Sequence, residues 1–403
     1  MPNTPKMNST DNHDDEHYIA GAHGTIAPQK DEAYYDDRSD ASDDMEKGQL
    51  KFPKSLYGRE KELDKLLSVY NEILVNCNDD RGNNNSSDGD SPGANIDAQD
   101  NMSTYKLSQI IWLGGYSGIG KTALVNEFIK RAQTKYTSSG SSESSSSIVH
   151  ASGKYSEQCN SSAPFSAIAN MLDNLAIQFS REGENKTTEK EKVWKNINSS
   201  EFIGPGKEGN VILCSTFPGL SQLINPDDTR NSSSTETSAQ TTSLNAIKEC
   251  TLELLSCICN ALDNPLILFL DDMQWGDSAS FDMLQFLLSS KDHLHNIMFI
   301  CSFRSNEVDE DHPFTTLMNN VVKERDGSKS VERMDLFSLS PEAITKFIAD
   351  SVKKEDDSEN EVSELGEAIY KKTMGNIFFV MQALEELVRK NVVFYDMMCF
   401  EWR

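Results

Sequence analysis

Residues 110–125 read I-I-W-L-G-G-Y-S-G-I-G-K-T-A-L-V and carry the strongest signal in the chain. Within them, G-Y-S-G-I-G-K-T at 115–122 fits the phosphate-loop pattern G-x-x-x-x-G-K-[ST]. The apolar residues 107–113 predict a strand before it, and the spacing of residues 121–136 predicts a helix after it. Backbone N–H groups of such a loop and of the helix N-terminus can surround an anion. We therefore predict a nucleotide-phosphate site; the alternative is a Gly-rich turn before a helix.

This loop supplies most of the expected nucleotide contacts. Lys121 can reach the β- and γ-phosphates of ATP and act in catalysis, and the Thr122 hydroxyl can bind Mg²⁺. The predicted binding residues of the loop are Gly115, Tyr116, Ser117, Gly118, Ile119, Gly120, Lys121, Thr122 and Ala123.

Composition limits the class of partner. The 403 residues carry a formal net charge of −26. Nonspecific binding to nucleic acid or to an anionic membrane needs a basic surface, so the net charge disfavours both kinds of binding. A local basic patch remains compatible with this charge. Residues 1–50 hold 12 Asp or Glu against four Lys or Arg and little apolar periodicity, which predicts a disordered acidic tail over 1–51.

Targeting signals are not evident in the sequence. The N-terminus is polar without an apolar core, and apolar runs such as 266–270 are too short to span a bilayer. The eight cysteines include no C-x-x-C pair, and the seven histidines show no metal-ligand spacing. We expect reduced thiols in an intracellular protein, in the cytoplasm first and the nucleus as the alternative.

Apolar runs alternate with helical patterns through the middle of the chain. Strands are predicted at 148–155, 266–270 and 296–303, and helices at 164–177, 210–224 with a break at Pro218, 244–262 and 278–290. Residues 182–209 are charged and weakly patterned. Strands that alternate with helices imply a parallel sheet whose ligands bind at the carboxyl ends of the strands.

The pattern changes after residues 331–337, which predict an edge strand. Helices are expected over 343–352, with Pro341 at the first helical position, and over 361–372 and 378–390. The final residues, V-V-F-Y-D-M-M-C-F-E-W-R, predict a hairpin that has only begun, as though the chain ended inside a domain.

The predicted fold class is therefore α/β. We expect a P-loop NTPase parallel sheet with helices on both faces, followed by a helical lid and the start of a winged-helix-like hairpin. The nucleotide-binding domain would span 52–337 with a low-complexity insertion at 78–104, and the lid and incomplete hairpin would span 338–403.

Two acidic residues follow the apolar run L-I-L-F-L and complete a Walker B pattern. Asp271 would hold Mg²⁺, and Asp272 would orient or deprotonate the attacking water. An apolar run ending in two acids is a weak signal alone, but it is strong together with a phosphate loop. Arg304 directly follows the next strand and could sense the γ-phosphate. For Trp275 and the potential helix N-cap at Asp277 or Ser278 we favour structural roles.

Five sequence blocks in order resemble one family. They are L-Y-G-R-E at 56–60, G-G-Y-S-G-I-G-K-T-A-L at 114–124, L-F-L-D-D-M-Q-W-G-D-S-A-S at 268–280, C-S-F-R-S-N-E-V at 301–308 and G-N-I-F-F-V at 375–380. G-K-Y-S-E-Q and A-P-F-S-A-I within 153–168 are similar to a further stretch of it. The chain resembles the STAND group of AAA+ ATPases, in the branch similar to origin-recognition-complex ATPase domains, whose modules occur in large signalling proteins.

The resemblance assigns further roles. Tyr57, Gly58 and Arg59 match an element near the adenine, Arg304 matches the sensor arginine, and Gly375 matches the start of the G-N-P-F-F lid element. Ile377 stands where the family has a proline that packs on the base, so the sequence departs from the family pattern in the lid element. The insertion at 78–104 is another.

The expected function is an ATP-binding regulatory switch that uses ATP and Mg²⁺ and hydrolyses ATP slowly. Effector regions or protein partners would receive its output, and oligomerisation is compatible with the family. One rival is a nucleotide-binding scaffold that does not hydrolyse ATP. The second is a DNA-associated initiator-type ATPase, which normally needs a basic winged helix that this acidic chain does not show.

Overall fold

The computed structural model describes residues 50–82, 108–137, 148–158, 164–180, 188–224, 243–325, 330–352, 359–396 and 401–402. All of them belong to one unit, Gly48–Arg403. The predicted tail over 1–51 lies outside the described residues except for its last two. The predicted insertion over 78–104 also lies outside them except for 78–82, which form the end of helix α1 (Glu60–Gly82).

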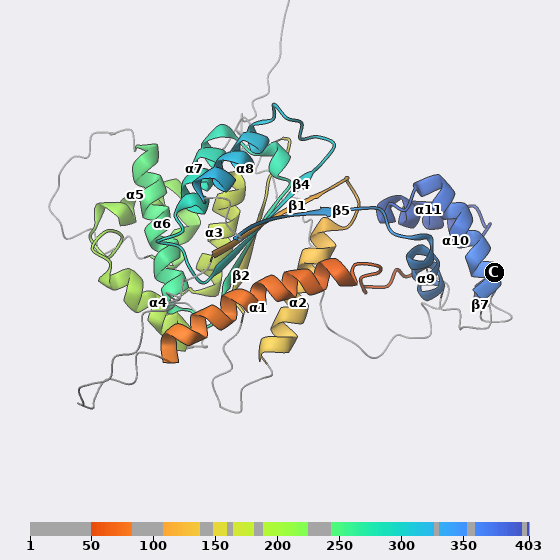
Figure 1. Ribbon diagram of the computed structural model, residues 1–403, viewed down its shortest axis with the longest axis horizontal. Helices are drawn as coiled ribbons and strands as arrows, with labels where there is room; N and C mark the ends of the chain where they lie inside the picture. The colour runs from red at the N-terminus through yellow and green to blue at the C-terminus, as the bar shows by residue number, and fades with distance from the viewer. Residues whose placement is uncertain are drawn as a thin grey trace, which may run out of the picture. The chain divides into compact units, whose positions relative to one another are not determined.

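Five parallel strands form the central sheet (Figure 1): β1 (Ser108–Gly115), β2 (His150–Lys154), β3 (Leu266–Asp271), β4 (Ile297–Arg304) and β5 (Val331–Leu336). Their order is β2-β3-β4-β1-β5, which confirms the predicted parallel sheet with 331–337 at an edge. The register pairs Gly115 with Arg304 and Lys154 with Asp271. Four strands therefore bring their carboxyl ends to the same end of the sheet.

Helices cover both faces of the sheet, as predicted. On β1, Ile111 and Leu113 belong to a hydrophobic cluster with helices α1 and α2 (Lys121–Thr137). The alternating residues Ile110 and Trp112 belong to a second cluster on the other face. That cluster includes side chains from α3 (Ser166–Gln178), α4 (Thr188–Ser199), α5 (Glu208–Thr216), α6 (Leu244–Ala261), α7 (Ser278–Ser289) and α8 (Pro313–Glu324).

Two of these helices were not predicted from the sequence. Helix α4 lies inside the stretch 182–209 that we described as weakly patterned, because its buried apolar residues are reduced to Val193 and Ile197. Helix α8 begins at Pro313, after the cap His312, and was not expected at all. None of the described helices is both long enough and apolar enough to cross a membrane.

Three helices follow the sheet: α9 (Pro341–Ser351), α10 (Glu359–Thr373) and α11 (Ile377–Arg389). They lie in the segment that we predicted to be a lid, and we refer to them by that name. Ser340 caps α9 by accepting a hydrogen bond from Ala343 N at 3.2 Å, and Pro341 occupies the first turn as predicted. Ile344 of α9 and Leu384 of α11 belong to a shared hydrophobic cluster. Beyond the lid, β6 (Tyr395–Asp396) pairs with β7 (Glu401–Trp402) in an antiparallel hairpin.

Strand β2 lies at one edge of the sheet, and side chains of α3 cover its outer carbonyl groups. Gln178 Nε2 donates to His150 O at 2.7 Å, and Asn174 Nδ2 donates to Ser152 O at 2.8 Å. Four residues of a helix rise about 6 Å, and two residues of a strand rise about 6.6 Å. The two repeats match, so successive amides of α3 meet successive outward carbonyls of β2.

Candidate functional site

The phosphate loop makes a tight turn between β1 and α2. Three of its glycines have positive φ, namely 154° at Gly115, 74° at Gly118 and 99° at Gly120. A Cβ atom on Gly118 would also lie 2.6 Å from Phe378 Cβ in the lid. Both the backbone conformation and the packing therefore require glycine at 118.

Lys121, the first residue of α2, points its ammonium group into the loop. Its Nζ donates to Gly115 O at 2.9 Å and to Tyr116 O at 3.1 Å. Burial lowers the pKa of Lys121, and the charges of Asp272 and Asp271 act in the opposite direction. The cation is thus already positioned beside the loop N–H groups, where phosphate oxygens can replace the carbonyl partners.

Thr122 and Asp271 join the phosphate loop to the Walker B strand. Thr122 Oγ1 donates to Asp271 Oδ2 at 2.9 Å. The other oxygen of Asp271 accepts from Ser302 Oγ of β4 and from Asp272 N. Among the described residues, no group of three or more His, Cys, Asp or Glu is placed to hold a metal. One hydroxyl and one carboxylate fit Mg²⁺, which takes its other ligands from water and phosphate.

Asp272 follows β3 and has both carboxylate oxygens engaged. Its backbone is left-handed, with φ 58° and ψ 47°. Lys154 Nζ lies 3.2 Å from Oδ2, while Gln274 Nε2 donates to Oδ1 at 3.0 Å and Arg304 Nε lies 3.4 Å from the same oxygen. The acid is therefore held between two cations and an amide.

Arg304 ends β4 and is fixed by groups on three sides. Its guanidinium lies 4.3 Å from the centre of the Trp275 ring, and Nη1 donates to Glu307 Oε1 at 2.8 Å. Its backbone N donates to Gln274 Oε1 at 3.1 Å. Burial lowers the pKa of Arg304, but the Glu307 hydrogen bond and the charge of Asp272 outweigh burial and leave the pKa raised. Trp275 thus packs against Arg304, in line with the structural role that we favoured, and Asp277 caps α7 through Ser280 N.

A cavity of about 310 Å³ lies between these groups and the lid. The predicted residues around it are Ser117, Gly118, Ile119, Gly120, Lys121, Thr122, Ala123, Asp271, Asp272 and Arg304. The lid contributes Ile377, Phe378 and Met381, so Ile377, at the family's proline position, lies on the cavity wall. The predicted residues Gly115 and Tyr116 do not line it; their carbonyls hold Lys121 instead.

Tyr57, Gly58 and Arg59 also lie outside the cavity wall, and they connect the loop to the lid. Tyr57 OH donates to Asp350 Oδ2 at 2.6 Å. Arg59, only 4 % exposed, donates from Nη2 to Ile119 O at 3.2 Å and to Phe337 O at 2.6 Å. The adenine contact that the resemblance implies for these residues stays a prediction.

The start of α11 contacts the phosphate loop directly. Asn376 caps the helix and its Nδ2 donates to Ser117 O at 2.8 Å. Phe378 N lies 3.3 Å from Gly118 O. Gly375, with φ 78°, accepts from Leu339 N at 3.0 Å, which fixes the turn before the helix. Two hydrogen bonds therefore connect the phosphate loop to the start of α11.

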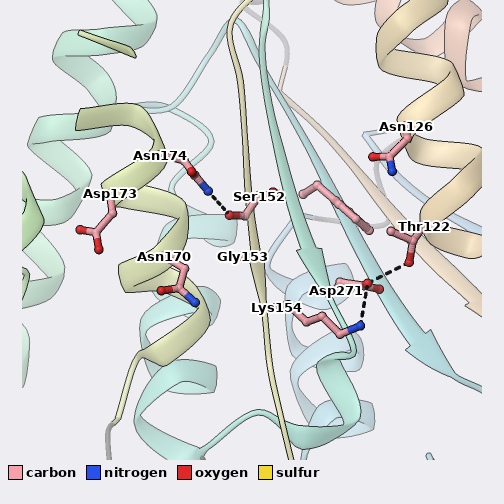
Figure 2. A pocket seen from close by; sticks show the side chains of 10 residues that line it. Thr122, Asn126, Ser152, Gly153, Lys154, Asn170, Asp173, Asn174 and Asp271 are labelled. Atoms are coloured by element: carbon pink, nitrogen blue, oxygen red, sulfur yellow. Dashed lines mark hydrogen bonds and ion pairs between the residues drawn. The ribbon is translucent and has the colours of Figure 1, made fainter. Parts of the chain in front are cut away.

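A second cavity, of about 500 Å³, lies on the other side of Thr122 and Asp271, between α2 and α3. Figure 2 shows Thr122 and Lys154 reaching Asp271 from two elements, with Asn126, Asn170 and Asn174 farther out. The described residues that line both cavities are Thr122, Lys154 and Asp271.

Sequence reasoning missed Lys154, Gln274 and Ser302. Lys154 ends β2, Gln274 lies three residues beyond the end of β3, and Ser302 lies two residues before the end of β4. A signal existed for each, because polar side chains that end neighbouring parallel strands meet at one end of the sheet. This signal could not be used from the sequence alone, because the order of the strands was not known.

Comparisons with solved structures find the following likenesses. The Aeropyrum pernix ORC1 protein in complex with DNA is 12% identical, with a TM-score of 0.35, over 74% of this chain and 50% of that one. A STAND protein with a tetratricopeptide repeat sensor from Pyrococcus horikoshii is 12% identical, with a TM-score of 0.29, over 71% and 29%. A chain of the HORMA:CdnC:Trip13 complex of E. coli MS115-1 is 11% identical, with a TM-score of 0.34, over 80% and 81%.

The chain thus spans half or less of the first two proteins. A comparison with curated protein sequences finds no match. The family model for the AAA ATPase domain matches residues 97–300, just over half of the chain, and includes the phosphate loop, Asp271 and Asp272. The chain therefore belongs to the AAA ATPase domain family.

Proposed function

We propose that this chain binds ATP with Mg²⁺ between the sheet and the lid, hydrolyses it slowly, and acts as a regulatory switch of a signalling protein. The observation that carries the proposal is the hydrogen bond from Thr122 Oγ1 to Asp271 Oδ2, beside Asp272, in a cavity that the lid closes on one side. It supports binding of a phosphate and an Mg²⁺ ion at one point.

The residues have separable roles. Loop N–H groups and Lys121 bind the phosphates, and Thr122 with Asp271 would hold Mg²⁺. In that position the ion would supply positive charge next to the β- and γ-phosphates. Asp272 accepts a proton from the water that attacks the γ-phosphorus. The bond from that phosphorus to the bridging oxygen breaks, ADP leaves with the electron pair, and inorganic phosphate forms. Arg304 stabilises the charge that develops on the γ-phosphoryl group.

The contacts between loop and lid support a switch. ATP in the cavity would touch the loop and α11 together, and Asn376 and Phe378 already bond the loop carbonyls. A ligand with different contacts in two lid positions shifts the balance between them. Hydrogen exchange of the amides at 376–381 should be slower with ATP than with ADP. Equal exchange in both states would contradict the switch.

Binding and turnover are tested with two substitutions. Lys121→Ala should abolish ATP binding in a fluorescent-nucleotide titration. Asp272→Asn should bind ATP at least as tightly as the parent and lower turnover by roughly 10²-fold or more. A Lys121→Ala chain that binds ATP like the parent would show that the loop is not the phosphate site.

The engaged state of Asp272 favours one rival, a scaffold that binds ATP without hydrolysing it. A carboxylate with both oxygens in ion pairs or hydrogen bonds is a poor proton acceptor. Single-turnover measurement with radiolabelled ATP separates the two: release of labelled phosphate supports the switch ATPase, and intact ATP after hours supports the scaffold.

A further inference from the structure

Lys154 lies at the carboxyl end of the edge strand β2, beside the two Walker B acids. It ends β2 and pairs in register with Asp271 of β3. Its Nζ lies 3.2 Å from Asp272 Oδ2 and 3.8 Å from Asp271 Oδ2. Figure 2 shows the side chain extended from β2 toward Asp271. Lys154 also lines the nucleotide cavity and the second cavity.

Of the described groups on the Asp272 carboxylate, Lys154 is the one with freedom to leave. The lysine side chain is 64 % exposed, against 22 % for Arg304. Arg304 is further held by Glu307 and by the ring of Trp275. Gln274 is buried and is fixed by the backbone of Arg304. A lysine stem is flexible, and the two cavities of about 310 and 500 Å³ give the ammonium room on either side.

Asp272 cannot serve as a base while all its partners stay in place. Its Oδ1 is occupied by Gln274 and Arg304, so Oδ2 is the oxygen that could accept a proton. Oδ2 becomes available only when Lys154 withdraws. The γ-phosphoryl group of ATP would enter the cavity that Lys154 lines, and it offers the ammonium a more highly charged partner than a single carboxylate.

This inference rests on the proposed function. We propose that Lys154 is a catalytic residue whose ammonium group moves from its ion pair with Asp272 to the γ-phosphoryl group when ATP binds. The transfer adds a third cation, beside Lys121 and Arg304, to the phosphoryl group. It also frees Asp272 Oδ2 to take the proton of the attacking water. ADP lacks the γ-phosphoryl group and leaves Lys154 on Asp272.

The test compares Lys154→Ala and Lys154→Arg with a matched control. Lys192 is a suitable control because its Nζ lies 3.2 Å from Asp263 Oδ1 and its side chain is 49 % exposed, on a helix away from the site. Each variant is titrated with ADP and with an imido-bridged, non-hydrolysable ATP analogue, and kcat is measured with ATP and Mg²⁺. Thermal denaturation checks that every variant folds.

Lys154→Ala should lower kcat by about 10²-fold, the usual effect of losing one donor to a transition-state oxygen. It should weaken the ATP analogue about tenfold or more and leave ADP within about twofold. Lys154→Arg should recover part of kcat, and Lys192→Ala should match the parent. If Lys154→Ala keeps or raises kcat, the lysine only restrains Asp272 and the proposal is wrong. Equal weakening of ADP and the analogue also overturns it.

A double-mutant cycle tests the transfer itself. Asp272→Asn should tighten binding of the ATP analogue by releasing Lys154, and this gain should shrink in the Lys154→Ala background. Equal gains in both backgrounds overturn the transfer. A parent chain that binds no ATP overturns the proposed function and this inference with it. If the Lys154→Ala chain hydrolyses ATP as well as the parent, the inference is wrong and the proposed function still holds.

Discussion

Replacing Arg59 by alanine should destabilise the chain even without nucleotide. Its Nη2 donates to Ile119 O of the phosphate loop and to Phe337 O, which directly follows β5 and precedes the lid. Hydrogen bonds from a charged donor contribute about 1.5–3 kcal/mol each, hence about 3–6 kcal/mol for two. Burial lowers the pKa of Arg59, which shows that desolvating the guanidinium offsets part of this gain. We expect a net loss of about 2–4 kcal/mol in the free energy of unfolding.

The assay is urea denaturation followed by circular dichroism, with no nucleotide present. Arg131→Ala is the control, because Arg131 is 46 % exposed and pairs with Glu127 one helical turn away at 2.8 Å. Its loss should cost less than about 0.5 kcal/mol. Arg59→Lys should lie between the parent and Arg59→Ala, since one ammonium group cannot reproduce the planar fork of donors.

A direct contact of Arg59 with the nucleotide predicts a different outcome. If Arg59→Ala unfolds at the same urea concentration as the parent but binds ATP more weakly, Arg59 acts on the nucleotide and does not join the loop to the lid. The role near the adenine that the family resemblance implies would then be the correct one.

Three further substitutions have defined outcomes. Gly118→Ala places a Cβ 2.6 Å from Phe378 Cβ at a backbone φ of 74°. It should displace the lid and weaken ATP binding about tenfold in a titration. An unchanged affinity for ATP would contradict the described contact between loop and lid. Asp277→Ala removes the N-cap of α7 and should lower stability by about 1 kcal/mol, seen as a lower Tm. Tyr57→Phe removes a 2.6 Å hydrogen bond to Asp350 and should cost about 1 kcal/mol at pH 7. Burial, and after it the hydrogen bond to Asp350, raises the pKa of the Tyr57 hydroxyl above 10.0. The stabilisation of the folded chain by this hydroxyl is therefore complete below pH 10.0 and is lost as pH rises through the raised pKa. Urea denaturation across that range should show the stability of the parent converging on that of Tyr57→Phe.

The central fold was predictable because its signals are local. The continuous apolar run of β3 and the glycines before α2 each specify an element without reference to the rest of the chain. Helix α4 escaped because tertiary packing, through Val193 and Ile197, stabilises a segment that is mostly polar. Lys154 escaped for a different reason: its position beside Asp272 depends on strand order, which pairs β2 with β3 across more than a hundred residues of sequence.

The contacts of Tyr57 and Arg59 within the folded chain could not be predicted from the sequence block that contains them. The sequence block indicates that these residues are special but not what they touch. In the structure Tyr57 contacts α9 and Arg59 contacts carbonyls of the loop and of the segment before the lid. The ion pair of Arg59 with Glu62, three residues later, could be read from the sequence. The carbonyl oxygens that Arg59 binds leave no such pattern, so only the folded chain reveals them.

The amides that α3 places along β2 have a consequence for self-association. An edge strand with open carbonyls is a template for another strand, and successive copies can build fibrils from it. Gln178 and Asn174 occupy the acceptors that a docking strand would need at His150 and Ser152. Helix α3 therefore blocks the addition of another strand at this edge of the sheet. Any assembly of this chain through β2 must use side-chain contacts rather than continuation of the sheet.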